Sequence, residues 1–190
     1  DVCSSDLNSG EQYRDTLIGQ AQNFIAAWVS HCLNLTGPSL VVDTACSSSL
    51  ISIHLACQSL RNGECDMAIA GGVDILISPE VYISLSQAGA LSPDGKCFTF
   101  DRKANGYVPG EGAGAVLLKP LSAALKDGDR IYGIIRGSAI NNDARTMGVT
   151  TPNLEAQKRV LEEAYQRAGV TPDRVTYIEA HGTEIGRAHV

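Results

Sequence analysis

Residues 40–60 carry the strongest indication of the fold and read Leu-Val-Val-Asp-Thr-Ala-Cys-Ser-Ser-Ser-Leu-Ile-Ser-Ile-His-Leu-Ala-Cys-Gln-Ser-Leu. Residues 40–42 are apolar and largely β-branched, which predicts a short buried strand. From Cys46 onward the apolar spacing is that of one helix face, which collects Leu50, Ile53, His54, Cys57 and Leu60. We therefore expect a strand, a tight turn and an amphipathic helix.

The segments on either side extend this pattern. Residues 23–28 and those that follow predict a helix, and Gly63 predicts the C-terminal cap of the central helix. Residues 67–70 predict the next strand, which ends at Gly71-Gly72. The order strand, helix, strand indicates a βαβ unit with a right-handed crossover, and hence an α/β fold with a parallel sheet.

Further along, residues 92–114 predict a long loop, and such loops inside compact domains are often functional. Strands are expected at 115–118 and 131–135, with Gly128-Asp129 as the turn signal between them.

The last segment begins with a helix that opens at Pro152-Asn153 and ends at Gly169. Its apolar face collects Leu154, Leu161, Ala164, Tyr165 and Ala168. A final strand at 175–178 then leads to His181-Gly182-Thr183.

Composition excludes several classes of protein. Of the 190 residues, 44% are hydrophobic and 19% are charged, which is typical of a globular chain and argues against disorder. The net charge of −6 argues against a nucleic-acid-binding surface. No apolar run reaches the ~18 residues of a membrane span, and no secretory signal opens the chain. We expect a cytoplasmic protein.

The six cysteines are too sparse for a disulfide scaffold. No C-x-x-C pair is present, which argues against a zinc site. We expect free thiols and no metal.

The two ends of the chain are related through their coding DNA. One DNA strand that encodes residues 1–7 has a reverse complement that, preceded by one G, encodes residues 184–190. Unrelated protein termini would not show this relation, and the string resembles a sequencing-library adapter. We therefore expect residues 1–7 and 184–190 to be non-native, and residues 8–183 to be one partial domain.

Cys46 is the first candidate site residue, because it lies where the predicted strand turns into the predicted helix. A thiol at a helix N-terminus feels the positive end of the helix dipole, which favours the thiolate. Free backbone N–H groups there can hold an oxyanion. The pattern parallels the nucleophile elbow of hydrolases. The alternative is a buried structural cysteine.

His181 is the second candidate, because it follows the last predicted strand, where α/β proteins place their sites. A structural role for a single histidine stays open. A cysteine nucleophile together with a histidine at a strand tip favours acyl-transfer chemistry.

Other candidates have simpler interpretations. His54 lies on the apolar face of the central helix and is expected in the core. The glycines of 110–114 lead into a strand rather than a helix, which excludes a dinucleotide-binding turn. The charges of 162–167 indicate a solvated helix face.

When the motifs around Cys46 and His181 are considered together, the sequence resembles the ketosynthase (beta-ketoacyl synthase) domain of modular type I polyketide synthases. The segments that carry the resemblance are 37–39, 42–49, 70–73, 91–95, 98–114, 137–143 and 179–183. It implies a thiolase-like fold with layers α-β-α-β-α, here incomplete, and a homodimer. No directly bound cofactor is implied, since 4'-phosphopantetheine is carried by an acyl carrier protein partner.

The resemblance also implies the roles of the site residues. Cys46 would accept an acyl or polyketide chain from a thioester. His181 would help to decarboxylate a malonyl-type extender, and the resulting carbanion would attack the Cys46 thioester. Thr183 would contact the substrate in the pantetheine channel.

The family continues with glycine where this chain has Glu184. A lysine, a second histidine and a Gly/Phe-rich turn that the family carries downstream are absent, so the resemblance implies half a site and an inactive chain. Two alternatives stay open. One is a ketosynthase of fatty-acid synthesis, and the other is a non-catalytic ketosynthase-like domain that gates or docks carrier proteins.

Overall fold

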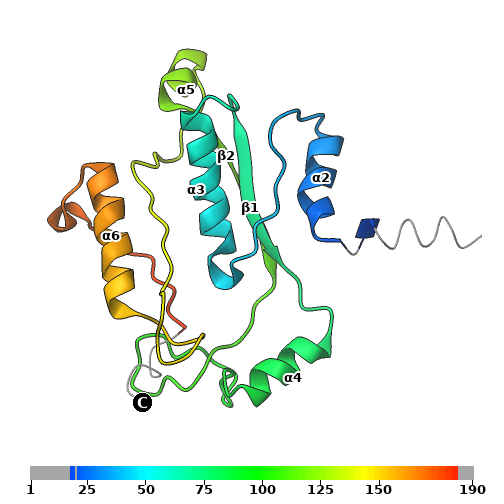
Figure 1. Ribbon diagram of the computed structural model, residues 1–190, viewed down its shortest axis with the longest axis vertical. Helices are drawn as coiled ribbons and strands as arrows, with labels where there is room; N and C mark the ends of the chain where they lie inside the picture. The colour runs from blue at the N-terminus through cyan, green and yellow to red at the C-terminus, as the bar shows by residue number, and fades with distance from the viewer. Residues whose placement is uncertain (1–17, 20, 184–190) are drawn as a thin grey trace, which may run out of the picture. The chain divides into compact units, whose positions relative to one another are not determined.

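The computed structural model describes residues 18–19 and 21–183 (Figure 1). The expected adapter segments, 1–7 and 184–190, lie outside the described residues. The chain divides into two compact units, Asp1–Gly71 with Val116–Ile134 and Gly72–Ala115 with Ile135–Val190. Each unit is described by itself.

The first unit holds the helix that the central stretch predicts. α3 spans Ser48–Arg61, and Gly63 follows it with a left-handed φ of +72°. The Gly63 N–H donates to the Leu60 carbonyl and the Glu64 N–H to the Ser59 carbonyl, which closes the helix as predicted. α2, at Asn23–Cys32, confirms the upstream helix.

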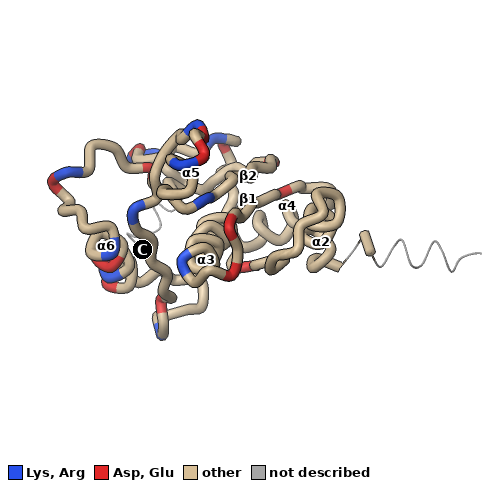
Figure 2. The backbone as a smooth tube through the Cα atoms, turned by 90° about the horizontal axis from the view of Figure 1, so that it is seen from above, with Lys and Arg blue, Asp and Glu red and all other residues tan. Residues whose placement is uncertain are grey.

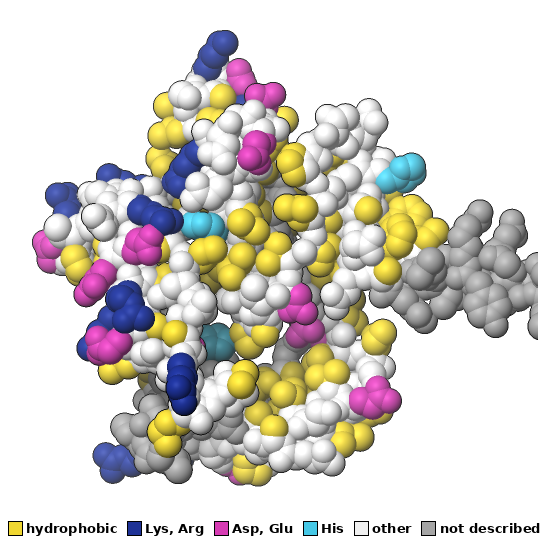
Figure 3. All heavy atoms as spheres, viewed as in Figure 1, with side chains coloured by type: hydrophobic (Ala, Val, Ile, Leu, Met, Phe, Trp, Pro, Cys, Tyr) yellow, Lys and Arg dark blue, Asp and Glu magenta, His cyan; other side chains and the backbone are white. Residues whose placement is uncertain are grey.

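His54 is 6% exposed, which confirms its expected place in the core. Leu50, expected on the same buried face, is 70% exposed, so that expectation is wrong. Figure 3 shows hydrophobic side chains at the surface on the viewed face. A helix face is buried only where another element covers it, and the periodicity of α3 does not supply that element.

β1 (Ala68–Asp74) and β2 (Gly112–Leu118) form a two-stranded sheet. Both strands are longer than predicted, because β1 continues through Gly71-Gly72 and β2 begins inside the expected loop. Glycine keeps both backbone hydrogen-bonding groups, so it can remain in a ladder.

The strands predicted at 40–42, 131–135 and 175–178 are not formed in the described part of the chain. The βαβ unit expected over 40–70 is therefore wrong as a strand pairing among residues 18–19 and 21–183. A strand is defined by its ladder partner, and the apolar runs at these positions do not determine which segment lies beside them.

In the second unit, α6 spans Leu154–Ala168 as predicted. Asn153 accepts hydrogen bonds from the Glu155 and Ala156 N–H groups, at 3.0 and 3.2 Å, and Gly169 ends the helix with a φ of +60°. Leu154 is 65% exposed, contrary to the expected buried face.

The charged face of α6 is confirmed. Lys/Arg and Asp/Glu residues occur together on this helix (Figure 2), and ion pairs join Glu155 to Lys158 and Glu163 to Arg167. Exposed pairs of this kind stabilise a helix only slightly.

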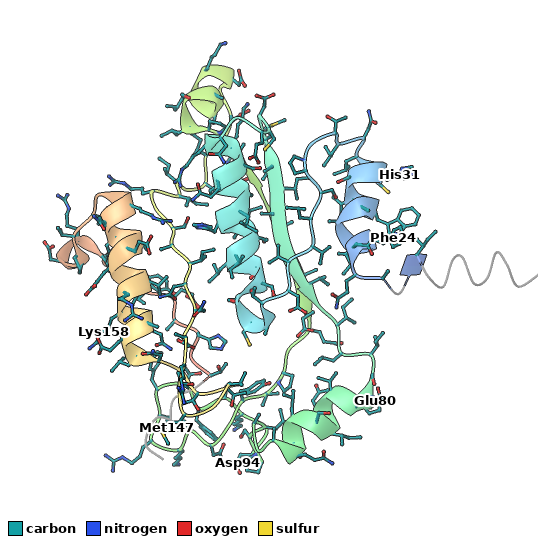
Figure 4. All side chains as sticks on the ribbon, viewed as in Figure 1. Phe24, His31, Glu80, Asp94, Met147 and Lys158 are labelled. Atoms are coloured by element: carbon teal, nitrogen blue, oxygen red, sulfur yellow. The ribbon has the colours of Figure 1, made fainter. Side chains whose placement is uncertain are left out.

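Sequence reasoning missed two short helices. α4 spans Pro79–Gln87, and Ser78 is its N-cap. The Ser78 Oγ accepts from the N–H of Glu80, which is labelled in Figure 4, at 3.3 Å. The signal was present, because Ser-Pro-Glu is typical of a helix start.

The second missed helix is α5 (Leu121–Asp127), which Gly128 ends with a φ of +72°. The predicted turn at 128–129 is thus a helix cap rather than a link between strands. Lys119 donates to Asp127 and Asp129 at 2.5 and 2.6 Å, and these hydrogen bonds raise the pKa of its ammonium group.

Residues 92–111 confirm most of the predicted loop, which is held by internal hydrogen bonds. The Ser92 hydroxyl donates to Asn105 Oδ1 at 2.8 Å, and Asn105 Nδ2 donates to Asp94 Oδ2 at 2.7 Å. Gly106 has a φ of +140°, and a Cβ there would lie 2.5 Å from the Leu91 carbonyl carbon. Only glycine fits this close approach.

Candidate active site

Cys46 lies in the 3-10 turn η2 (Ala45–Ser47), which runs directly into the N-terminus of α3. The thiol is free and exposed. The residue before it, Ala45, has a φ of +53°. For a residue with a Cβ, this left-handed conformation costs about 1 to 2 kcal/mol. The backbone therefore turns sharply at Ala45, as the elbow interpretation requires.

Hydrogen bonds from both sides hold this elbow. Asp43 Oδ1 accepts from the Ala45 N–H at 3.0 Å. Ser48 Oγ accepts from the Thr44 N–H at 2.9 Å and donates to the Ala45 carbonyl at 2.7 Å. Backbone strain persists where the surroundings hold it in place, and these side chains do so here. Sequence reasoning missed both roles, although an Asp two residues before a turn residue is typical of an Asx turn.

The helix behind the elbow is tied to the sheet. Ser52, one turn into α3, places its Oγ 2.7 Å from the Ser49 carbonyl oxygen and 3.0 Å from that of Gly71 in β1. The N-terminus of α3 therefore has a defined place within the first unit. A helix N-terminus presents backbone N–H groups and the positive end of the helix dipole, which makes the position of Cys46 favourable for an anion or an oxyanion.

His181 lies in the second unit, after residues 175–180, which form neither helix nor strand, and it is exposed. Gly182 has a φ of +74°, and Thr183 is half-buried. In the segment that leads to this turn, the Tyr177 hydroxyl donates to Glu179 Oε2 at 2.6 Å, which raises the pKa of the tyrosine. His181 and Thr183 are thus brought together by one turn.

Cys46 belongs to the first unit and His181 to the second. Their pairing in one site stays a prediction. The roles of Cys46, His181 and Thr183 likewise stay predictions at this point.

The other features of the described residues give weaker support for a functional site. A cavity of about 510 Å³ at the end of α6 is lined by Arg136, Gly169, Val170 and Arg174. Cationic side chains are favourable at a helix C-terminus, which accounts for the two arginines. Residues 18–19 and 21–183 contain no group of three His, Cys, Asp or Glu side chains that could hold a metal ion.

The cysteines at 32, 46, 57, 65 and 97 are free thiols, as expected. Within the part of the chain that the structure describes, no helix is both long enough and apolar enough to cross a membrane.

A thiol on a tight turn at a helix N-terminus is the arrangement used by enzymes that form acyl-cysteine intermediates. The sequence model of the beta-ketoacyl synthase N-terminal domain matches residues 2–124, and that of the C-terminal domain matches residues 132–186. The chain belongs to the beta-ketoacyl synthase family.

Among its relatives, polyketide synthase PksN of Bacillus subtilis is 60% identical over 155 residues, which are 82% of this chain and 3% of the relative. A phenolphthiocerol/phthiocerol polyketide synthase subunit of Mycobacterium tuberculosis is 52% identical over 182 residues, which are 96% of this chain and 10% of that protein.

Two solved structures confirm the thiolase-like fold of the family. The ketosynthase from module 6 of the bacillaene synthase of Bacillus subtilis 168 superposes with a TM-score of 0.85 at 50% identity, over 87% of this chain and 30% of the ketosynthase. An oxazolomycin ketosynthase domain from Streptomyces albus gives a TM-score of 0.85 at 45% identity, over 86% of this chain and 28% of that domain. The chain therefore spans less than a third of these solved ketosynthases.

Proposed function

We propose that this chain forms the nucleophile-bearing part of a condensing transferase of the 3-oxoacyl-[acyl-carrier-protein] synthase type, acting in polyketide biosynthesis. The observation that carries the proposal is the exposed Cys46 thiol on a hydrogen-bonded elbow at the N-terminus of α3. The polyketide synthase relatives support the polyketide branch over the fatty-acid alternative.

In the first step the Cys46 sulfur attacks the carbonyl carbon of an acyl thioester. A new carbon–sulfur bond forms to Cys46, the bond to the carrier thiol breaks, and the proton of Cys46 leaves with that thiol. The N–H groups at the start of α3 can hold the oxyanion that forms in between.

In the second step His181 donates a hydrogen bond to the thioester carbonyl oxygen of a malonyl-type extender. The bond to the carboxylate breaks, carbon dioxide leaves, and the electron pair becomes an enolate that this hydrogen bond stabilises. The enolate carbon attacks the carbonyl of the Cys46 thioester. The new carbon–carbon bond gives a β-ketoacyl product, and Cys46 leaves as the thiolate.

The pantetheine arm that delivers both thioesters belongs to the acyl carrier protein and is part of the substrate. Thr183, half-buried beside His181, has a hydroxyl that suits the amide groups of this arm. The proposed partners are acyl carrier protein and a second copy of the domain. The five cysteines among the described residues are free thiols, which is typical of a reducing compartment and supports a cytoplasmic place for the reaction.

Because the chain spans 30% of a solved ketosynthase, we expect it to be inactive alone. The test therefore uses a hybrid ketosynthase, in which residues 8–183 replace the matching segment of the bacillaene synthase module 6 ketosynthase. Intact-protein and peptide mass spectrometry follow its acylation by an acyl thioester. Condensation is followed with malonyl-loaded acyl carrier protein.

We expect one acyl group per chain on the Cys46 peptide and a β-ketoacyl product. Cys46→Ala removes the nucleophile and should abolish both. Cys32→Ser, at another exposed cysteine, is the matched control and should change neither. No adduct on the Cys46 peptide would contradict the nucleophile assignment. Acylation without condensation would favour the carrier-gating alternative.

A further inference from the structure

Thr99 packs against the backbone one residue after His181. A Cβ on Gly182 would lie 2.8 Å from Thr99 Cγ2 and 3.7 Å from Thr99 Oγ1. The methyl group, rather than the hydroxyl, is therefore the part of Thr99 that meets Gly182. Both residues belong to the second unit.

Gly182 needs this neighbour for a physical reason. Its φ of +74° lies in the left-handed region, which glycine enters without steric cost but does not prefer over other regions. The backbone at a glycine is flexible unless a neighbouring side chain fills the space beside it. The Thr99 methyl occupies that space, so it limits the backbone conformations that would swing His181 away.

Thr99 itself lies in a turn that is held under strain. The Asp101 N–H donates to the Phe98 carbonyl at 3.0 Å, and Phe100 within the turn has a φ of +61°. A bulky aromatic residue in the left-handed region is an outlier. Phe100 is also 71% exposed, so burial of its ring does not stabilise the strained backbone.

Contacts on both sides of this turn hold it in place. Before it, Cys97 Sγ accepts from the Val108 N–H at 3.1 Å. After it, Asp101 Oδ1 accepts from the Lys103 N–H at 2.8 Å, and the Ala104 N–H donates to the Asp101 carbonyl at 3.1 Å. The turn at 98–101 is thus a fixed support against which Gly182 rests, and strain of this kind often marks a functional place.

We propose that Thr99 is a positioning residue for His181, acting through the contact of its Cγ2 methyl with Gly182. The inference rests on the proposed function, since it assigns Thr99 to the decarboxylation step that His181 serves. It gives Thr99 no part in the acylation of Cys46. Thr99 touches neither substrate nor reacting atoms in this role.

The test separates the methyl from the hydroxyl in the hybrid ketosynthase. Thr99→Ser keeps Oγ1 and removes Cγ2, whereas Thr99→Val keeps the β-branched shape and removes the hydroxyl. We expect Thr99→Ser to lower kcat for decarboxylation of the malonyl thioester about 10-fold with little change in KM, because a small misplacement of a catalytic group is costly. Thr99→Val should stay close to the unsubstituted hybrid.

Two controls make the result specific. Acylation of Cys46 should be equal in all variants, and Thr150→Ser, at another exposed threonine of the second unit, should leave decarboxylation unchanged. If Thr99→Val is the slow variant, or if acylation falls in step with decarboxylation, the positioning role is overturned. His181→Ala distinguishes the two proposals. Loss of decarboxylation there with full activity in Thr99→Ser overturns only the role of Thr99, whereas retained decarboxylation overturns the role of His181.

Discussion

The Cys46 elbow and the His181 turn both place a candidate site residue next to a left-handed residue, but they hold that residue by different means. At the elbow the left-handed residue is Ala45, which carries a Cβ, and Asp43 and Ser48 fix it by hydrogen bonds. At the turn it is Gly182, which has no Cβ and is confined by the Thr99 methyl.

Each unit therefore orders its candidate site residue through a different kind of interaction. Hydrogen bonds offset the strain of Ala45, so the elbow is specified by side chains within a few residues of Cys46. Gly182 is not strained, so its order must come from packing by a segment distant in sequence. The elbow should therefore respond to local polar substitutions, and the His181 turn to changes in volume.

The largest effect is expected where volume is added to the His181 turn. In the hybrid ketosynthase, Gly182→Ala places a Cβ in the left-handed region and against Thr99, and should destabilise by about 2 to 5 kcal/mol. Decarboxylation should fall by more than acylation of Cys46. Denaturant unfolding and the two step assays measure this.

The double variant Gly182→Ala with Thr99→Gly removes the crowding side chain but leaves the left-handed strain. It should recover part of the lost stability relative to Gly182→Ala alone. A double variant that recovers nothing would show that the two residues are not in contact.

A smaller effect is expected from the elbow clamp. Asp43→Ala removes the acceptor of the Ala45 N–H, and the lost hydrogen bond should destabilise by about 1 kcal/mol. If that loss appears fully in the acylation barrier, Cys46 is acylated about fivefold more slowly. Asp43→Asn keeps an oxygen acceptor and is the matched control. Equal acylation rates for Asp43→Ala and the unsubstituted hybrid would contradict the role of Asp43 in holding the elbow.

The smallest effect has the opposite sign. Ala45→Gly relieves about 1 to 2 kcal/mol of left-handed strain and adds about 0.5 to 1 kcal/mol of unfolded-state entropy. The net result should be a stabilisation of about 0.5 to 1 kcal/mol in denaturant unfolding.

Ala27→Gly inside α2 is the control for this substitution, because a helical alanine has no strain to relieve. It should destabilise by about 1 kcal/mol. If Ala45→Gly also destabilises, the backbone at the elbow is not strained.

Helices were predictable to the extent that their ends carry their own signals. Asn153 and Gly169 bound α6 as expected, and Gly63 ends α3. The Ser-Pro-Glu start of α4 shows that a further helix could have been found from the sequence. These helix ends depend on residues no more than four positions apart, so the signals can be recognised in the sequence itself.

The candidate site residues could be predicted from the sequence, but the contacts and backbone geometry that hold them in place could not. The position of Cys46 on the turn before a helix could be predicted, because the change of apolar period at that point is visible in the local sequence. The contact of Thr99 with Gly182 joins two segments far apart in the chain, and no pattern in either segment indicates it. Ala45 is an ordinary residue in sequence, and only its φ of +53° marks the elbow as strained.

Short-range signals were enough to predict α2, α3, α6, the glycine caps of α3 and α6, and the family motifs, because each depends on residues close together in the chain. The tertiary structure, in contrast, selects which apolar runs become strands, and it leaves 40–42, 131–135 and 175–178 outside the sheet of β1 and β2. It likewise decided which faces are buried, leaving Leu50 exposed and His54 covered. Strand pairing and burial both need a partner segment, and a partner is a property of the folded chain rather than of a local pattern.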